Sequence, residues 1–492
     1  MKQTTPLIVD LDGSLLRTDT LHELIAASLG RPRVLFGAVR QLLTHGRAAL
    51  KRYLANNASL DIDLLPVNER VLEFVRAEHA TGRTVHLATG ADAIIAEAIT
   101  RRFPEFSRSF ASDGEANLTS SNKAELLERE FGAAGFDYIG NSAKDRAVWQ
   151  RADRAYLASD RPMNRPPGWS RGVEFAGLLT EAGQPGWRVW LKELRIHQSV
   201  KNFLIFLPTI AAHVFEMQTL LLLLGGFVSF TLMASSVYLL NDLLDLRSDR
   251  LHTRKFQRPI AAGRILPVHA LAASIGLAVV ALAFAVAIGV AFALVLVSYA
   301  VITCLYSFWL KRVTLVDVIV LALLYMVRIL AGSVIAGIEL SFWFTAVVLF
   351  LFISLALVKR YTELSRSVAL DGSHSLHGRG YTRADAAVIL SLGIATGMAV
   401  LLLMSIYLQS DAVTLIYPSG VFLWLVIPAL FYWIANMWIQ AGRGAMHDDP
   451  IVFAFKNPAS LASAAIIALL FVVASTPLAA VAKDMLDGLS LR

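Results

Sequence analysis

The chain has 492 residues, of which 56% are hydrophobic, and a mean hydropathy of +0.56. This length predicts two or more domains. The net charge of +7 belongs largely to short loops between apolar segments, so it indicates membrane topology and excludes a nucleic-acid-binding function. The single cysteine, Cys304, lies inside an apolar segment and excludes an intrachain disulfide.

Three short apolar runs near the start of the chain each end in polar residues, as buried strands of a parallel sheet do. These runs and the polar residues after them are 7–9 with Asp10 and Asp12, 85–88 with Thr89, and 136–139 with Asn141 and Asp145. Open α/β sheets bind ligands at the carboxyl ends of their strands, so we expect these side chains at one edge. Residues 155–158 predict another strand, and the helical periodicity of 21–80 predicts a cap over the site.

This order of motifs, with Lys123 opening a helical stretch before the third run, resembles the haloacid dehalogenase (HAD) superfamily of aspartyl-phosphate phosphatases over residues 7 to about 160. The resemblance implies that Asp10 is the nucleophile, that Asp12 is the general acid and base, and that Thr89 and Lys123 hold the phosphate. The implied Mg²⁺ ligands are Asp10, Asp12, Asn141 and Asp145. Many HAD proteins have Asp in place of Asn141, and Asn brings no negative charge. The alternative is a degenerate domain kept for folding or regulation.

The rest of the chain is predicted to be a linker over 161–190, an all-α membrane domain over 191–480 and a tail over 481–492. The domain contains nine apolar stretches near the roughly 20 residues that cross a bilayer. They are 201–215, 218–240, 266–288, 290–310, 314–338, 341–359, 385–408, 418–440 and 457–477.

Basic residues occur only in alternate loops of this domain. Lys and Arg precede the first stretch and follow the second, fourth, sixth and eighth, whereas the loops near Glu216, Gly289, Glu339 and Asp411 have none. The positive-inside rule then places the N-terminal domain in the cytosol and, with nine crossings, the C-terminus outside an inner (cell) membrane. No signal peptide is expected, because acidic residues interrupt the first apolar run.

Four oxygen-bearing side chains follow the second apolar stretch at helical spacing: Asn241, Asp242, Asp245 and Asp249. On a helix they converge on one face. Crowded carboxylates are tolerated when they share a hard cation such as Mg²⁺, which also bridges to substrate phosphates. Lys255 and Arg258 follow at once and could hold the remaining phosphate oxygens. The alternative is a solvated helix end at the edge of the bilayer.

This pattern resembles the UbiA superfamily of membrane prenyltransferases over residues 190 to about 475. Three segments resemble its decaprenyl-phosphate phosphoribosyltransferase branch, namely 195–202, 252–263 and 359–364. The resemblance implies that the acidic motif binds a Mg²⁺-diphosphate, with Asp242 and Asp245 essential for catalysis. The implied substrate-binding residues are Lys201, Asn202, Asn241, Lys255, Arg258, Arg328, Lys359 and Arg360. Lys359 and Arg360 would bind a sugar phosphate, or else serve only as topological anchors, and Arg328 is singled out because intramembrane charges are costly.

The leading interpretation is transfer of phosphoribosyl from phosphoribosyl diphosphate to a polyprenyl phosphate, with the fused phosphatase removing the 5-phosphate. A first alternative is an aromatic prenyltransferase that uses a polyprenyl diphosphate. It is disfavoured because Asp371 and Asp385 are too far apart to form a second acidic loop. A second is a transporter or lipid-binding protein with a regulatory domain, which would place more charge near the bilayer midplane.

Overall fold

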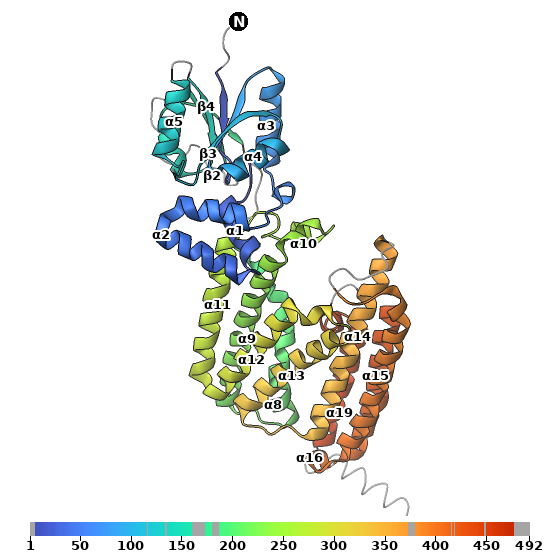
Figure 1. Ribbon diagram of the computed structural model, residues 1–492. Helices are drawn as coiled ribbons and strands as arrows, with labels where there is room; N and C mark the ends of the chain where they lie inside the picture. Colours follow the sequence, from blue (N-terminus) through green and yellow to red (C-terminus); the bar gives the residue numbers. More distant parts are fainter. Residues whose placement is uncertain are drawn as a thin grey trace, which may run out of the picture. The chain divides into compact units, whose positions relative to one another are not determined.

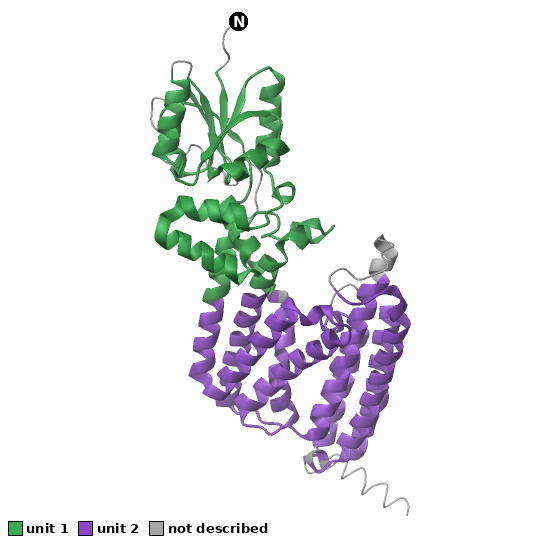
Figure 2. Cartoon of the chain, viewed as in Figure 1, with its two compact units in different colours: residues 1–195, 238–276 green, residues 196–237, 277–492 purple. Residues whose placement is uncertain are grey.

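The computed structural model describes residues 5–115, 117–132, 135–159, 173–179, 186–371, 379–414, 416–417, 419–446 and 449–476. The chain forms two compact units, coloured separately in Figure 2. Unit 1 comprises residues 1–195 and 238–276, and unit 2 comprises 196–237 and 277–492. The acidic motif therefore belongs to the same compact unit as the N-terminal domain.

The core of unit 1 is a parallel sheet with the strand order β3-β2-β1-β4-β5-β6 (Figure 1). Its strands are β1 (Leu7–Val9), β2 (Val85–Asp92), β3 (Phe106–Ser112), β4 (Asp137–Gly140), β5 (Arg154–Ala158) and β6 (Glu174–Leu179). The central strand β1 is fully buried and pairs with β2 and β4, which explains its uninterrupted apolar sequence. The predicted α/β fold is confirmed.

Strand β6 differs from the prediction, because it lies inside the segment 161–190 that we expected to be a linker. The sheet therefore continues to Leu179. Residues 186–190 of the same segment begin helix α7 (Gly186–Glu193). The strand has a half-exposed edge position and a central glycine, Gly177, and both features weaken the sequence signal of a strand.

Helices cover both faces of this sheet. Alternate residues of β1 enter different cores, with Leu7 and Val9 in one and Ile8 in the other, as the two-residue period of a strand requires. The main helices of unit 1 are α1 (Thr20–Ser28), α2 (Pro32–Asn57), α3 (Glu69–Ala80), α4 (Ala93–Arg102), α5 (Ser121–Phe131), α6 (Arg146–Trp149), α7 and α10 (Leu246–Leu251). Helices α1 and α2 come from the predicted cap segment.

Unit 2 is built of long apolar helices. Across the described residues, eight helices are long and apolar enough to cross a membrane: α9 (Met217–Leu244), α11 (Pro267–Ile288), α12 (Val290–Phe308), α13 (Val316–Ala336), α14 (Phe342–Asp371), α15 (Ala386–Leu408), α17 (Val426–Gly442) and α19 (Pro458–Ser475). They match the second to ninth predicted stretches.

The first predicted stretch, 201–215, is not a regular helix. Residues Ile196–Phe206 form 3₁₀ turns and are followed by the short helix α8 (Leu207–Ala211). This segment packs along α13, where the carbonyl oxygen of Ile205 lies so close to Gly332 that a Cβ there would be 1.9 Å away. A 3₁₀ helix rises about 2 Å per residue, so the eleven residues of the 3₁₀ segment extend over about 22 Å at most.

Candidate functional site

Asp10 lies at the carboxyl end of β1 among other polar groups of the sheet edge. Lys123 donates from Nζ to Asp10 Oδ1 at 2.6 Å and lies 3.9 Å from Asp145 Oδ1. All three side chains are buried. Burial raises the pKa of Asp10 to about 6, although the charge of Lys123 opposes the rise. The structure thus brings together three of the residues predicted to form a phosphatase site.

Asp12 is held by the first residue of helix α1. The backbone N–H and the hydroxyl of Thr20 donate to its carboxylate at 2.8 and 3.3 Å. Burial, together with the neighbouring charge of Asp19, raises the pKa of Asp12 to about 8. A carboxyl group with this pKa is protonated at neutral pH, which is the state that a general acid needs.

Asn141 fastens the loop after β4 to the loop after β1. Its Nδ2 donates to the backbone oxygen of Asp12 at 3.2 Å. Gly13 has φ +77°, and a Cβ there would lie 1.8 Å from Nδ2 of Asn141, so the close approach requires glycine. Asp145 accepts from the N–H groups of Asn141 and Ser142. Within the described part of the chain, no three His, Cys, Asp or Glu side chains are arranged to hold a metal ion.

The remaining predicted phosphate ligand of this domain, Thr89, is buried within β2, and its hydroxyl accepts from the N–H of Ala91 at 3.0 Å. Beside it lies a cation that the sequence analysis missed. Lys51 of α2 donates from Nζ to the carbonyl of Gly90 at 2.6 Å and to Asn117 Oδ1 at 2.8 Å. Burial lowers the pKa of Lys51. Nothing in the local sequence distinguishes Lys51 from an ordinary surface lysine of a helix.

The acidic motif lies where α9 ends and α10 begins. The interruption falls at Asp245, so the motif is not one continuous helix. The backbone bonds from Asp245 N to Asn241 O and from Asp249 N to Asp245 O, each 2.8 Å, nevertheless continue across the junction. The helical spacing of the motif is therefore preserved.

Two arginines neutralise the motif. Arg195 binds both oxygens of Asp242, at 2.5 and 2.6 Å, and Arg258 bridges Asp242 at 2.8 Å and Asp249 at 2.5 Å. Lys255 lies 3.9 Å from Asp249. The structure thus brings the predicted residues Asp242, Asp249, Lys255 and Arg258 together.

A further carboxylate, Glu193 of α7, was missed by the sequence analysis. It is buried, and its Oε1 has no hydrogen-bond partner among the described residues; the same holds for Oδ1 of Asp249. Burial, together with the charge of Asp242, raises the pKa of Glu193 to about 8. The only sequence signal is its place two residues before Arg195. Buried carboxylate oxygens in excess of their donors suit a bound cation.

Unit 2 contains a basic cluster around Asp449, a residue that the sequence analysis did not select. Lys201 and Lys359 donate to the same Oδ2 of Asp449 at 2.8 and 2.9 Å. Burial alone would raise the pKa of Asp449, but the charges of Lys359 and Lys201 hold it well below its usual range. The sequence signal that could have identified Asp449 is its position directly before Pro450. Asp449 is the N-cap of the short helix that begins at Pro450.

Arg328 also lies in the interior of unit 2. It donates to Asn202 Oδ1 at 2.9 Å and to the hydroxyl of Tyr299 at 3.0 Å, and with Lys201 beside Asn202 it continues the basic cluster. Arg360 lies in a different network. It is 1% exposed and is paired with Asp317 at 2.6 Å and with Glu363. The structure therefore groups three of the predicted cations of unit 2 and separates Arg360 from their ion pairs.

Residues 203–455, just over half of the chain, match the UbiA prenyltransferase family. The chain belongs to the UbiA prenyltransferase family. It is thus an integral membrane protein and a transferase of that superfamily, and the expected UbiA-like membrane domain is confirmed. The acidic motif begins at Asn241 and lies inside the matched region.

Three comparisons show what the chain is similar to. The protein y4nM of Sinorhizobium fredii is 36% identical over 95% of this chain and 91% of its own length. The decaprenyl-phosphate phosphoribosyltransferase of Corynebacterium glutamicum is 38% identical over 35% of this chain, and the match spans 54% of that protein. A structure of phosphoserine phosphatase is 17% identical in sequence and has a TM-score of 0.24. The match covers 32% of this chain and 86% of the phosphatase chain.

Proposed function

We propose that the membrane domain transfers phosphoribosyl from phosphoribosyl diphosphate to a polyprenyl phosphate. The observation that carries the proposal is the basic cluster of two buried cations, Lys201 and Arg328, and the partly exposed Lys359, in which Asp449 is the one ion-paired carboxylate. Buried cations without matching carboxylates favour an anionic ligand. Both substrates carry phosphate groups, and lysine and arginine bind phosphate through charge-assisted hydrogen bonds.

The acidic motif is proposed to hold Mg²⁺. The residues that would bind it are Asn241, Asp242, Asp245 and Asp249. Oδ1 of Asp249, which accepts no hydrogen bond from the described residues, supports this choice. Mg²⁺ prefers oxygen ligands and, when bound, would stabilise the charge of a departing diphosphate. Arg195 and Arg258 contact Asp242. They would bind oxygens of the diphosphate.

In the proposed reaction an oxygen of the lipid phosphate bonds to C1 of the ribose while the bond from C1 to the diphosphate oxygen breaks. The products are a 5-phosphoribosyl lipid and diphosphate. The protein's part is to align the two phosphorylated substrates and to stabilise the negative charge that leaves. No side chain needs to become covalently modified.

The α/β domain is proposed to remove the 5-phosphate from this lipid. Asp10 would attack phosphorus while Asp12 gives its proton to the leaving 5-oxygen, and Asp12 would then accept a proton from the water that hydrolyses the aspartyl phosphate. The raised pKa of Asp12, about 8, supports the acid role. Lys123 and Thr89 would bind the phosphate oxygens.

Both catalytic domains are proposed to work on the cytosolic side of an inner membrane. The basic loops support this orientation, and the 3₁₀ segment 196–206 with α8 would provide the first of nine crossings. A reporter fused to the C-terminus should be active only outside, and one inserted after Arg443 only in the cytosol. A cytosolic C-terminus would show that the 3₁₀ segment does not cross.

The transferase proposal is tested with purified membranes, phosphoribosyl diphosphate labelled in the ribose, and a polyprenyl phosphate. We expect a labelled lipid that forms only when Mg²⁺ is present. Asp449, beside the lysines of the basic cluster, is an acidic residue outside the motif at 241–249. An aromatic prenyltransferase is expected to have a second acidic site of this kind. A parallel assay therefore supplies a polyprenyl diphosphate with an aromatic acceptor, and turnover there alone would replace the proposal.

A further inference from the structure

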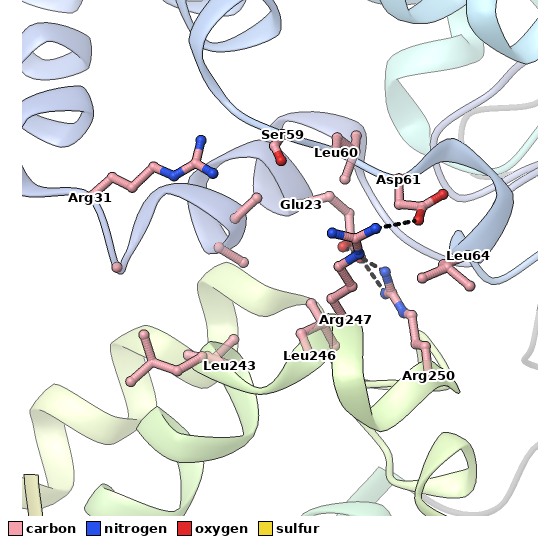
Figure 3. A pocket seen from close by; sticks show the side chains of 14 residues that line it. Glu23, Arg31, Ser59, Leu60, Asp61, Leu64, Leu243, Leu246, Arg247 and Arg250 are labelled. Carbon is pink, nitrogen blue, oxygen red and sulfur yellow. Dashed lines mark hydrogen bonds and ion pairs between the residues drawn. The ribbon is translucent and has the colours of Figure 1, made fainter. Parts of the chain in front are cut away.

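A buried ion pair joins the two halves of unit 1. Glu23 of α1 is 1% exposed, and the Arg250 side chain of α10 is 7% exposed. The guanidinium of Arg250 donates to both carboxylate oxygens of Glu23, at 3.0 and 2.7 Å. Figure 3 shows the two side chains pointing toward each other. Two residues that are 227 positions apart thus form a bidentate pair away from water.

The pair is fixed at both ends. Thr18 donates from its hydroxyl to Glu23 Oε1 at 2.7 Å, and Nε of Arg250 donates to the carbonyl of Ala261 at 3.0 Å. Arg250 therefore connects helix α1 with helix α10 and with the loop that follows Arg258. An acidic residue in the first turn of a helix is favourable by itself, but that does not require burial or a bidentate arginine.

Two further contacts hold the same segment against the α/β domain. Arg247 donates to Asp61 at 3.2 Å, beside a pocket of about 280 Å³ (Figure 3). Gly263 has φ +72°, and a Cβ there would lie 2.8 Å from Pro66 and 3.0 Å from Arg17. The loop after the acidic motif is thus fitted to the surface of the α/β domain at several points.

The ion pair between Glu23 and Arg250 lies next to residues of both proposed sites of unit 1. Asp249, a proposed Mg²⁺ ligand, precedes Arg250 on a helix of only six residues, which is too short to be stable without tertiary contacts. On the other side, α1 begins with Thr20, which holds Asp12. We propose that Glu23 and Arg250 are positioning residues of the transferase. Through this pair the α/β domain holds the acidic motif in its active geometry, and this role does not depend on the phosphatase chemistry of the α/β domain.

This inference rests on the proposed transferase function. Replacing one member of a buried ion pair leaves the other charge uncompensated, whereas replacing both with apolar residues is often neutral. The variants are therefore Glu23→Leu, Arg250→Met and the double variant. The matched control is Glu130→Leu, which breaks the exposed pair between Arg108 and Glu130 in the same domain.

For each single variant we expect kcat of transfer to fall about tenfold, a size typical of coupling between sites, with the KM for polyprenyl phosphate unchanged. The double variant should recover to within about threefold of wild type, because its apolar pair repacks. The control should match wild type.

Hydrogen exchange on the purified full-length protein provides a readout other than activity. Amides of 246–251 should exchange faster in both single variants than in wild type, and those of 121–131 should not. If the double variant is as impaired as Arg250→Met, Arg250 acts on the substrate and the positioning role is wrong. Wild-type kinetics and exchange in all variants would also overturn it. If wild type itself transfers no phosphoribosyl, the proposed function fails and the exchange data alone decide the inference.

Discussion

The two compact units differ in the balance of their buried charges. In unit 1 carboxylates are in excess: the pKa values of Asp10 and Asp12 are raised to about 6 and about 8, mainly by burial, and oxygens of Glu193 and Asp249 have no hydrogen-bond partner among the described residues. In unit 2 two lysines share Asp449, whose pKa is lowered although burial opposes the change. Ligands of opposite charge are therefore expected in the two units.

An excess of buried carboxylate is stabilised by a cation, and an excess of buried lysine and arginine by an anion. Transfer from a diphosphate needs both kinds of site, a carboxylate-rich site for Mg²⁺ and a cationic site for the phosphates. In the proposed function, the acidic motif of unit 1 binds Mg²⁺ and the basic cluster of unit 2 binds phosphate groups. The following predictions are ordered by expected effect.

The first prediction removes a charge from the acidic motif. Asp242→Asn should lower the rate of transfer at least about a hundredfold, as loss of a group that stabilises the transition state does. The asparagine keeps the shape of the side chain, so the protein should stay folded. The measurement is labelled lipid formed per minute, with Asp411→Asn in a loop without basic residues as the control. Equal rates for both variants would remove Asp242 from the reaction.

The second prediction concerns the pH dependence of the phosphatase. Asp10 must be ionised to attack, so the rate should rise as pH increases through about 6; Asp12 must be protonated to act as an acid, so the rate should fall about tenfold per unit above pH 8. Bound Mg²⁺ would move both limbs to lower pH, because a nearby cation favours the ionised form of each carboxyl group. The measurement is hydrolysis of the phosphorylated ribosyl lipid from pH 5 to 10. A rate that keeps rising above pH 9 would contradict the acid role.

The third prediction tests the basic cluster. Lys359→Ala should raise the KM for phosphoribosyl diphosphate about tenfold, the effect of losing one charged hydrogen bond, with a smaller change in kcat. Lys456→Ala, an exposed lysine of a basic loop, is the control for a purely topological role. An unchanged KM in Lys359→Ala would make Lys359 a membrane anchor and would leave the cluster without a substrate.

Much of this arrangement could be predicted from the sequence because it depends on local spacing. The strand ends that carry Asp10 and Asp12, the helical spacing of the acidic motif and the eight long apolar helices follow from periodicity and composition. The site residues themselves remain predictions, although the structure places most of them beside one another.

The rest depends on contacts between distant segments, which no local pattern specifies. Lys51, Glu193 and Asp449 are ordinary charged residues until the fold places them beside Gly90, Asp242 and the lysines of unit 2. The 3₁₀ segment 196–206 was predicted as part of a helix because its composition is apolar, yet its backbone packs on Gly332 of α13. The edge strand β6 was missed because it is only partly buried.

We propose that one chain first adds a phosphoribosyl group to a lipid and then removes its 5-phosphate. The most direct measurement supplies phosphoribosyl diphosphate that carries one label in the ribose and another in the 5-phosphate, and follows both labels into the lipid. Wild type should yield lipid that retains the ribose label and loses the phosphate label, Asp10→Asn should retain both, and Asp242→Asn should form no labelled lipid. A wild-type lipid that keeps both labels at equal ratio throughout the reaction would contradict the account.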